Sequence, residues 1–166
     1  MLATKWAKDA YLAKVTLDTA MDNSLTRAEI SAMRRSYGEA GLETLPADPF
    51  AAFMTWLTEA RANPVIVEAN AMVLSTLGGD GDISTRTVLL KDVSEGGFTF
   101  FTNYSSRKSH AIEINPQVTL LFPWYAMERQ ISISGTAEKI SQTESAEYFA
   151  TRPWNSQIGA WASHQS

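Results

Sequence analysis

The stretch "AMVLSTLGGDGDISTRTVLLKDVSEGGFTFFTN", residues 71–103, decides the fold class. It contains three runs rich in β-branched and aromatic residues, 71–77, 84–93 and 97–103, and such runs are typical of strands. The segments between them, "GGDGD" and "SEGG", are tight reversals that favour antiparallel hairpins. The stretch therefore predicts three consecutive antiparallel strands.

The sequence that follows adds two strands and two helices. Residues 118–124 and 129–140 show strand patterns. A helix is predicted over 105–115, and another over 141–152 opens with a capping-box sequence and stops at Pro153. Strands joined mostly by short turns favour a mainly β fold, an antiparallel barrel or sandwich with flanking helices, over a doubly wound parallel sheet.

Two helices are predicted before the first strand. Thr26 and Glu29 form a capping box at the start of a helix that Gly38 can end. Asp48 is placed to cap a second helix, with Pro49 at its first position.

Composition excludes several classes of function. The chain has 166 residues, 45% of them hydrophobic, which fits one domain. Its 14 basic and 18 acidic residues give a formal net charge of −4, which argues against a nucleic-acid binder. With no cysteine and two histidines, neither a thiolate nor a multi-histidine metal site is expected.

No signal-peptide core or bilayer-spanning stretch is evident, so we expect no membrane association and a cytoplasmic location. We expect one domain over residues 24–166. Residues 1–23 form an N-terminal extension that we expect to be disordered or strapped onto the domain.

Two cationic side chains flank the apolar run "RTVLLKD", residues 86–92. Strand alternation places Arg86 and Lys91 on opposite faces. Either both are strand-end charges that reach solvent, or they meet two anions, or one ligand is held from two sides.

The segment "TNYSSRKSH" is the stronger anion-site candidate. It lies where a strand ends and a helix begins, with Ser105 and Ser106 able to cap the helix and with exposed N–H groups. Arg107 and Lys108 are suited to phosphate, and cations at a helix N-terminus oppose the helix dipole unless an anion is bound there.

Two further sets of polar residues admit both a binding and a structural interpretation. Gln130 begins a strand, where it could contact a heterocycle or simply face solvent. Tyr148 and Arg152 share one helical face, with Ser156 in the loop beyond. These three could form a phosphate cage, or Arg152 could face the last helix carbonyls.

Several long motifs in one order resemble the pyridoxine (pyridoxamine) 5′-phosphate oxidase family. They are "RTVLLK", "FFTNYSSRKSHAIEINPQVTLLFPW", "ERQISISGTAEKIS" and "YFATRPWNSQIGAWASHQS", preceded by "MRRSYGEAGLETLPADPF". The resemblance implies a split β-barrel and a homodimer with FMN at the subunit interface. It also implies oxidation of pyridoxine or pyridoxamine 5′-phosphate to pyridoxal 5′-phosphate, with O₂ reduced to hydrogen peroxide, and flavin chemistry without a catalytic side chain.

The resemblance also implies site residues. The FMN-binding positions are Arg86, Thr87, Val88, Leu89, Leu90, Lys91, Phe101, Thr102, Arg107, Lys108, Gln130, Gln165 and Ser166. The positions that bind the substrate are Lys91, Tyr148, Arg152 and Ser156 around its phosphate, with Arg34, Arg35 and Tyr37 in a stretch that can fold over it. Members often have Tyr where this chain has Phe101, so a backbone contact is expected there.

The sequence ends at "SHQS", whereas the family continues into a C-terminal segment with a Trp and an Arg for the flavin site and an Arg-x-His motif over the substrate. We therefore expect a C-terminally truncated oxidase that binds FMN and turns over slowly. The alternatives are a split-barrel flavin reductase acting on another substrate and a non-catalytic FMN- or pyridoxal-phosphate-binding protein.

Overall fold

The computed structural model describes residues 25–36, 38, 45–94 and 96–162, with the backbone alone for the last three. The chain divides into two compact units, residues 1–37 and 38–166, and each is described by itself. No helix among the described residues has the length and apolarity needed to cross a bilayer.

The first unit contains helix α2, Arg27–Ala32. The Thr26 hydroxyl accepts a hydrogen bond from the Glu29 N–H at 3.2 Å, and the Glu29 carboxylate accepts one from the Thr26 N–H at 2.7 Å, which confirms the capping box. The helix ends well before the predicted stop at Gly38. It buries none of its residues, and a helix this short gains little without packing.

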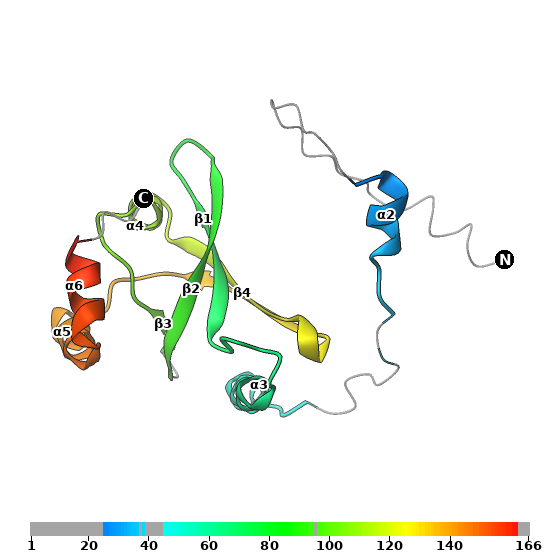
Figure 1. The fold of residues 1–166 in the computed structure, drawn as a ribbon. Helices are drawn as coiled ribbons and strands as arrows, with labels where there is room; N and C mark the ends of the chain where they lie inside the picture. Colours follow the sequence, from blue (N-terminus) through cyan, green and yellow to red (C-terminus); the bar gives the residue numbers. More distant parts are fainter. Residues whose placement is uncertain (1–24, 37, 39–44, 95, 163–166) are drawn as a thin grey trace. The chain divides into compact units, whose positions relative to one another are not determined.

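The second unit is built on a five-stranded antiparallel sheet with the order β3-β2-β1-β4-β5. The sheet curls into a half-barrel with helices around it, as predicted (Figure 1). Its strands are β1 Ala71–Leu77, β2 Ile83–Ser94, β3 Gly97–Phe100, β4 Gln117–Trp124 and β5 Arg129–Thr136.

Two strands are shorter than the sequence predicts. β3 ends at Phe100 although 101–103 continue the strand pattern, because the chain turns there into the helix that follows. β5 ends at Thr136 and not at residue 140. The Ala137 N–H still donates to the Pro116 carbonyl at 2.8 Å, but proline has no N–H with which to continue the ladder.

The core lies on the inward face of the sheet. Along β1, the side chains that point to this face are buried, and the side chains between them are more exposed. Helix α3, Pro49–Ala62, covers part of this face and begins at Asp48, whose carboxylate accepts from the Phe50 and Ala51 N–H groups as predicted. Phe53 from α3 packs edge-on against Phe122, with ring centroids 5.0 Å apart. The buried core residues are Phe53, Ala60, Met72, Leu74, Leu90, Leu120, Phe122 and Trp124.

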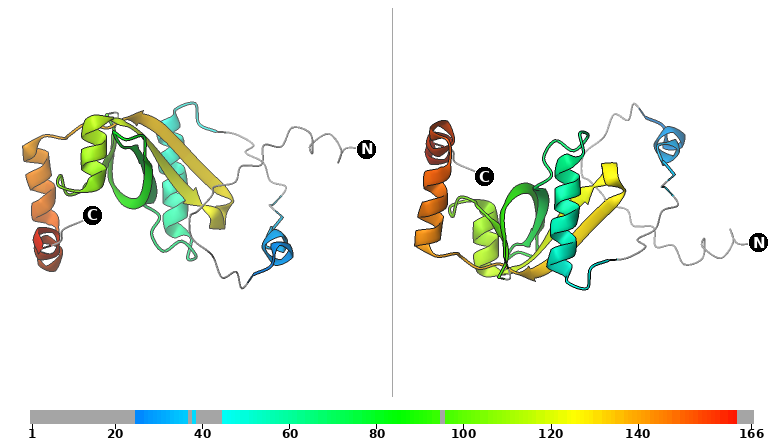
Figure 2. Two further views of the ribbon diagram at one scale, coloured as in Figure 1. Left: turned by 90° about the horizontal axis from the view of Figure 1, so that it is seen from above. Right: turned by 90° about the horizontal axis from the view of Figure 1, so that it is seen from below.

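The remaining helices lie around the sheet. They are α4 Arg107–Ile114, the 3₁₀ turn η1 Tyr125–Met127, α5 Gln142–Thr151 and α6 Trp154–Ala162. The predicted capping box of α5, between Ser141 and Glu144, is confirmed. Both views of Figure 2 place α5 and α6 together on one side of the sheet, with α4 between them and the sheet and α3 on the other side.

A β-bulge interrupts the pairing of β2 with β3. Leu90 pairs with Phe100 and Asp92 with Thr99, so Lys91 has no partner residue on β3. The bulge changes the alternation of side chains along β2. As a result Leu90 and Val93, three residues apart, both face the core, although regular alternation would place them on opposite faces. Bulges of this kind re-aim side chains.

The core packing yields a stability prediction. Phe122→Ala removes a side chain with no exposed surface, so we expect the free energy of unfolding to fall by about 3–5 kcal/mol. Tyr125→Ala, three residues away with its side chain 74% exposed, serves as the control and should change it by less than about 0.5 kcal/mol. Urea denaturation followed by circular dichroism measures both, and equal losses would contradict this account of the core.

Candidate functional site

Three cations from two elements form what we call the cation cluster: Arg86 on β2, and Arg107 and Lys108 in the first turn of α4. Arg86 projects from the inward face of β2, as the alternation predicts. Its guanidinium donates to the Thr76 hydroxyl at 2.8 Å, the Ser84 hydroxyl at 2.6 Å and the Leu74 carbonyl at 3.3 Å. These neutral acceptors fix the guanidinium without compensating its charge.

The start of α4 presents backbone donors beside this cluster. The first N–H groups with helix-type partners are those of Ser109 and His110, which donate to the Ser106 carbonyl. The Arg107 and Lys108 N–H groups have no acceptor among the described residues. Free N–H groups at a helix N-terminus, reinforced by the helix dipole, favour a bound anion.

The predicted capping by serine is wrong in its detail. Ser106 occupies the N-cap position, but its side chain accepts no helix N–H. It is fully buried in a chain of hydroxyls, 3.2 Å from the Ser109 hydroxyl and 3.5 Å from that of Thr102. The Ser105 N–H donates to the Asn103 side chain at 2.9 Å. The serines therefore shape the turn and leave the helix donors free.

Lys108 is the most unusual member of the cluster, because it is only 8% exposed. Burial lowers its pKa, and the nearby Arg86 charge lowers that pKa further. Burial likewise lowers the pKa of Arg86, with a further contribution from Arg107. The Lys108 ammonium has no hydrogen bond or ion pair with any described residue. Such mutual repulsion is relieved when an anion binds.

A cavity of about 300 Å³ opens beside the cluster and is lined by Arg86, Arg107 and His110 on the basic side. Asp82 also lines it, and its carboxylate lies 3.4 Å from the Arg107 guanidinium, with both side chains about two thirds exposed. Exposed pairs of this kind contribute little stability, so Arg107 remains available to a stronger anion. Sequence patterns gave no signal for this pairing, which joins residues 25 positions apart.

Lys91, at the bulge, is exposed and faces away from Arg86, as predicted. Between them Val88 and Leu90 share the inward face with Arg86, whereas Thr87 is exposed. Leu89 is half-buried on the other face. One strand therefore presents cations in two directions.

Gln130 lies apart from the cation cluster. It pairs with Pro123 and is exposed on the face of β5 opposite to Ile131 and Ile133, which pack against the core. Arg86 projects from the other face, and β1 and β4 lie between β2 and β5 in the sheet. One chain by itself does not bring Gln130 and Arg86 together.

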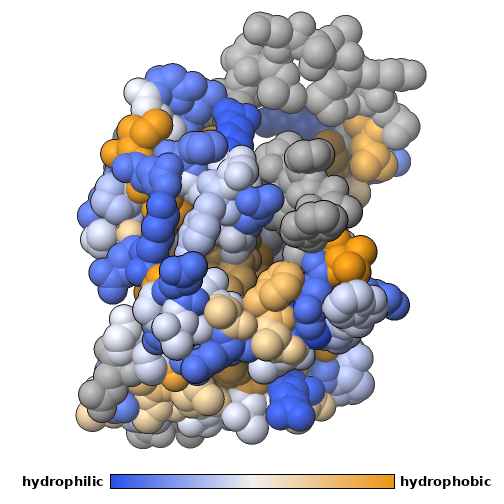
Figure 3. Space-filling model, turned by 90° about the vertical axis from the view of Figure 1, so that its left-hand side faces the viewer, coloured by the Kyte–Doolittle hydropathy of each residue, from blue (hydrophilic) through white to orange (hydrophobic). Residues whose placement is uncertain are grey.

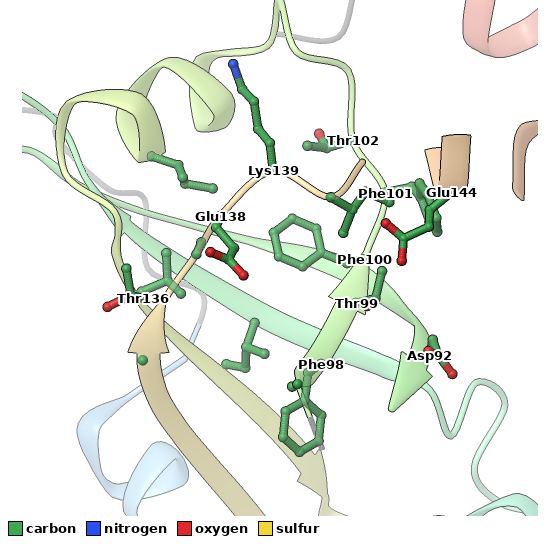
Figure 4. Close-up of a pocket in the computed structure, with 18 of the residues that line it drawn as sticks. Asp92, Phe98, Thr99, Phe100, Phe101, Thr102, Thr136, Glu138, Lys139 and Glu144 are labelled. Carbon is green, nitrogen blue, oxygen red and sulfur yellow. The ribbon is translucent and has the colours of Figure 1, made fainter. Parts of the chain in front are cut away.

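Phe101 and Thr102 follow β3 and line a second cavity, of about 890 Å³, between β3, α4 and the segment after β5. Figure 4 shows the Phe100 ring in the middle of this cavity, with Glu138 and Lys139 on one side and Glu144 on the other. The Phe101 ring stacks on Tyr148 of α5, with centroids 3.5 Å apart and planes 8° from parallel.

The predicted phosphate-cage residues lie on two successive helices. Tyr148 is on α5 and Arg152 caps its end, with the guanidinium 5.9 Å from the Phe149 ring. Ser156 lies inside α6 and not in a loop, which corrects the prediction: Pro153 ends α5 but also starts the next helix, where its carbonyl accepts from the Ser156 N–H at 2.8 Å.

All of these site assignments stay predictions, and three of the residues cannot be placed. Tyr37, Gln165 and Ser166 lie outside the described residues. Arg34 and Arg35 are exposed in the first unit.

Comparison with known proteins gives a consistent result. A family model described as pyridoxamine 5′-phosphate oxidase matches residues 58–166. The pyridoxine/pyridoxamine 5′-phosphate oxidases of Shewanella sediminis and Rubrobacter xylanophilus are 48% and 52% identical to the chain over 141 and 143 residues, 84% of it in each case. The chain spans slightly less than two thirds of these relatives, 66% and 65% of their lengths.

Solved structures show the same fold. PhzG from Burkholderia lata, in complex with tetrahydrophenazine-1-carboxylic acid, superimposes with a TM-score of 0.69 at 29% identity, covering 73% of this chain and 59% of that one. An FMN-binding protein from Nostoc punctiforme, related to pyridoxamine 5′-phosphate oxidase, has a TM-score of 0.54 at 19% identity and covers 68% and 62%. The half-barrel therefore belongs to the split-barrel fold.

The electrostatics of Lys108 yield a prediction. Because its pKa is lowered in the folded protein, the charged ammonium destabilises the ligand-free fold at neutral pH. This cost decreases as pH rises from the lowered pKa to the ordinary pKa of lysine. Lys108→Met should therefore raise the melting temperature of the ligand-free protein at pH 7 by about 2 °C, and the gain should shrink towards high pH.

The same variant should lose most of the stabilisation that inorganic pyrophosphate gives the wild-type protein. The control is Lys139→Met, which removes a lysine paired with Glu113 at 2.6 Å and should leave the pyrophosphate response intact. Differential scanning fluorimetry measures both. A lower melting temperature for ligand-free Lys108→Met, with an unchanged pyrophosphate response, would refute the anion site.

Proposed function

The chain belongs to the pyridoxamine 5′-phosphate oxidase family, and from this premise we propose that it is an FMN-dependent oxidase of vitamin B6 phosphates. The reaction converts pyridoxine or pyridoxamine 5′-phosphate to pyridoxal 5′-phosphate, with O₂ reduced to hydrogen peroxide. FMN, when bound, supplies the two-electron redox chemistry. The protein side chains bind and orient, and none is required as a nucleophile.

The cation cluster is the observation that carries the proposal. Arg86 is fixed by neutral hydroxyls. The Lys108 side chain is largely buried but its ammonium has no counter-ion among the described residues, and α4 offers free N–H donors beside both. This set of cationic and N–H donors fits the dianionic phosphate of FMN. A neutral ligand of the same shape would leave the positive charges without a counter-ion. We assign Arg86, Arg107 and Lys108 to that phosphate.

The remaining assignments follow the family resemblance. Residues 87–91, Phe101, Thr102, Gln130, Gln165 and Ser166 would contact the cofactor. The substrate phosphate would be held by Lys91, Tyr148, Arg152 and Ser156, and covered by Arg34, Arg35 and Tyr37. The opposite directions of Arg86 and Lys91 support this division, because two phosphates can then approach β2 without sharing a cation.

The separation of Gln130 and Arg86 supports a homodimer, if both contact the flavin as the family resemblance implies. They lie on opposite faces of the sheet within one chain, so a single flavin that contacts both must take them from different copies. We therefore place FMN at the interface of two subunits.

A second candidate is a split-barrel flavin enzyme that acts on a different substrate. The similar structure PhzG, for example, is in complex with tetrahydrophenazine-1-carboxylic acid, which is not a B6 phosphate. The higher identity to the B6 oxidases and the presence of Lys91, Tyr148, Arg152 and Ser156 favour the B6 phosphates. A protein that binds FMN or pyridoxal phosphate without turnover is a further alternative, which an activity assay decides.

The function is tested by incubating the chain with FMN and pyridoxine 5′-phosphate in air and measuring pyridoxal 5′-phosphate and peroxide. We expect the two products in equal amounts. Bound FMN with neither product would refute the oxidase.

Arg152→Leu separates the substrate site from the cofactor site. Loss of a charge-assisted phosphate contact should raise KM for pyridoxine 5′-phosphate by about tenfold or more, with little change in FMN affinity. Arg61→Leu, at an exposed arginine on α3, is the matched control and should change neither value. Loss of FMN from Arg152→Leu would place this arginine in the cofactor site instead.

Mixed dimers test the shared site. Arg86→Met and Gln130→Leu should each weaken FMN binding when present in both subunits. Mixing the two unfolded variants and refolding them together should restore about one site in four, since half of the dimers are mixed and each mixed dimer has one intact site. No recovery in dimers confirmed by light scattering would show that each site uses one chain alone.

A further inference from the structure

The two helices after β5, residues 141–162, form what we call the α5–α6 arm, and they carry three of the four proposed substrate-phosphate residues. All hydrogen bonds of the arm among the described residues are internal, such as that from the Gln157 side chain to the Arg152 carbonyl at 2.7 Å. No ion pair joins the described side chains of the arm to the sheet or to α4. Polar contacts among the described side chains therefore do not position this arm.

An aromatic stack provides the side-chain contact that polar groups do not. Phe101, directly after β3, and Tyr148, on α5, are both half-buried and lie nearly parallel at 3.5 Å between ring centroids. Figure 3 views the side of the molecule on which the arm lies, where hydrophobic residues are interspersed with hydrophilic ones at the surface. Aromatic pairs contribute specific geometry beyond the area they bury.

The Phe101 side of the stack is firmly held. Phe100 pairs with Leu90 across the sheet. On the other side, the Thr102 hydroxyl lies 3.5 Å from that of Ser106, and the Asn103 carbonyl accepts from the Ser109 hydroxyl at 2.8 Å. The ring is therefore anchored by a strand before it and a helix after it, and it offers a fixed surface to the Tyr148 ring.

On the other side of the stack, the Tyr148 hydroxyl remains free to bind a ligand. It has no hydrogen-bond partner among the described residues, although its ring is held face-on. Arg152 lies four residues further on, so that fixing the Tyr148 ring also fixes the rotation of α5 that determines where the guanidinium points. The stack thus sets two phosphate-binding groups at once.

We propose that Phe101 is a positioning residue for the substrate phosphate: its ring docks the α5–α6 arm and holds Tyr148 and Arg152 in place for a phosphate monoester. This inference rests on the proposed function for the identity of the ligand. It assigns to the Phe101 side chain a role distinct from the cofactor contact, which is expected through the backbone at this position.

The test compares Phe101→Leu, which removes the ring but keeps apolar volume, with Phe101→Tyr, which keeps the ring. Pyridoxal 5′-phosphate serves as the probe, and its affinity is measured by calorimetry alongside that of FMN. Phe101→Leu should weaken pyridoxal 5′-phosphate binding by about three- to tenfold, with a much smaller effect on FMN, and Phe101→Tyr should restore the affinity. Tyr104→Leu, at an exposed aromatic three residues away, is the control.

Hydrogen exchange of residues 142–151 gives a second readout that needs no ligand. Phe101→Leu should speed exchange in α5, whereas Tyr104→Leu and Tyr148→Phe should not, because Tyr148→Phe keeps the stack and removes only the hydroxyl. Equal losses of FMN and pyridoxal phosphate affinity in Phe101→Leu would overturn the positioning role, as would unchanged affinity for both. If the wild-type chain binds no pyridoxal phosphate, the proposed function fails. In that case the hydrogen-exchange result alone tests the docking role, and unchanged exchange of α5 in Phe101→Leu would overturn it.

Discussion

A charged guanidinium on the inward face of a core strand is the constraint to which the rest of the site responds. Arg86 lies in register with the fully buried Leu74, in a position that an apolar residue would normally occupy. Thr76 and Ser84 supply hydroxyl acceptors, and the cavity beside β2 keeps part of the guanidinium in contact with water. The fold tolerates one such charge by these means, but Lys108 adds a second beside it, and a bound anion would offset the repulsion between the two.

Much of this arrangement could be predicted, because strand alternation, tight turns and helix capping each depend on residues that are close together in the sequence. The strand over 71–77, the two hairpin turns and both capping boxes were predicted correctly, and so was the opposite orientation of Arg86 and Lys91. The bulge at Lys91 was not predicted, because alternation assumes continuous pairing. The early end of β3 was missed for a related reason: Phe101 is as apolar as a strand residue, but it packs against a helix and not within the sheet.

The candidate site was predicted in the same uneven way. Arg107 and Lys108 adjoin a predicted helix start, so their position in the first turn of α4 could be predicted from local sequence. The Asp82–Arg107 pair and the Phe101–Tyr148 stack join residues that are far apart in the chain, and no periodicity reports such contacts. The position of Ser156 was wrong because proline was interpreted only as the end of α5, whereas its fixed backbone angle also suits the start of α6.

The eight residues from Phe101 to Lys108 connect the two proposed phosphate sites. At one end, the ring of Phe101 contacts α5; at the other, Arg107 and Lys108 join the cation cluster. The hydroxyls of Thr102 and Ser106 lie between them and, with that of Ser109 just beyond Lys108, form a partly buried chain of contacts that links the two ends. A ligand that tightens the start of α4 therefore also steadies the ring on which Tyr148 rests. Cofactor and substrate phosphates would then be coupled through packing, without sharing a single charged residue of this segment.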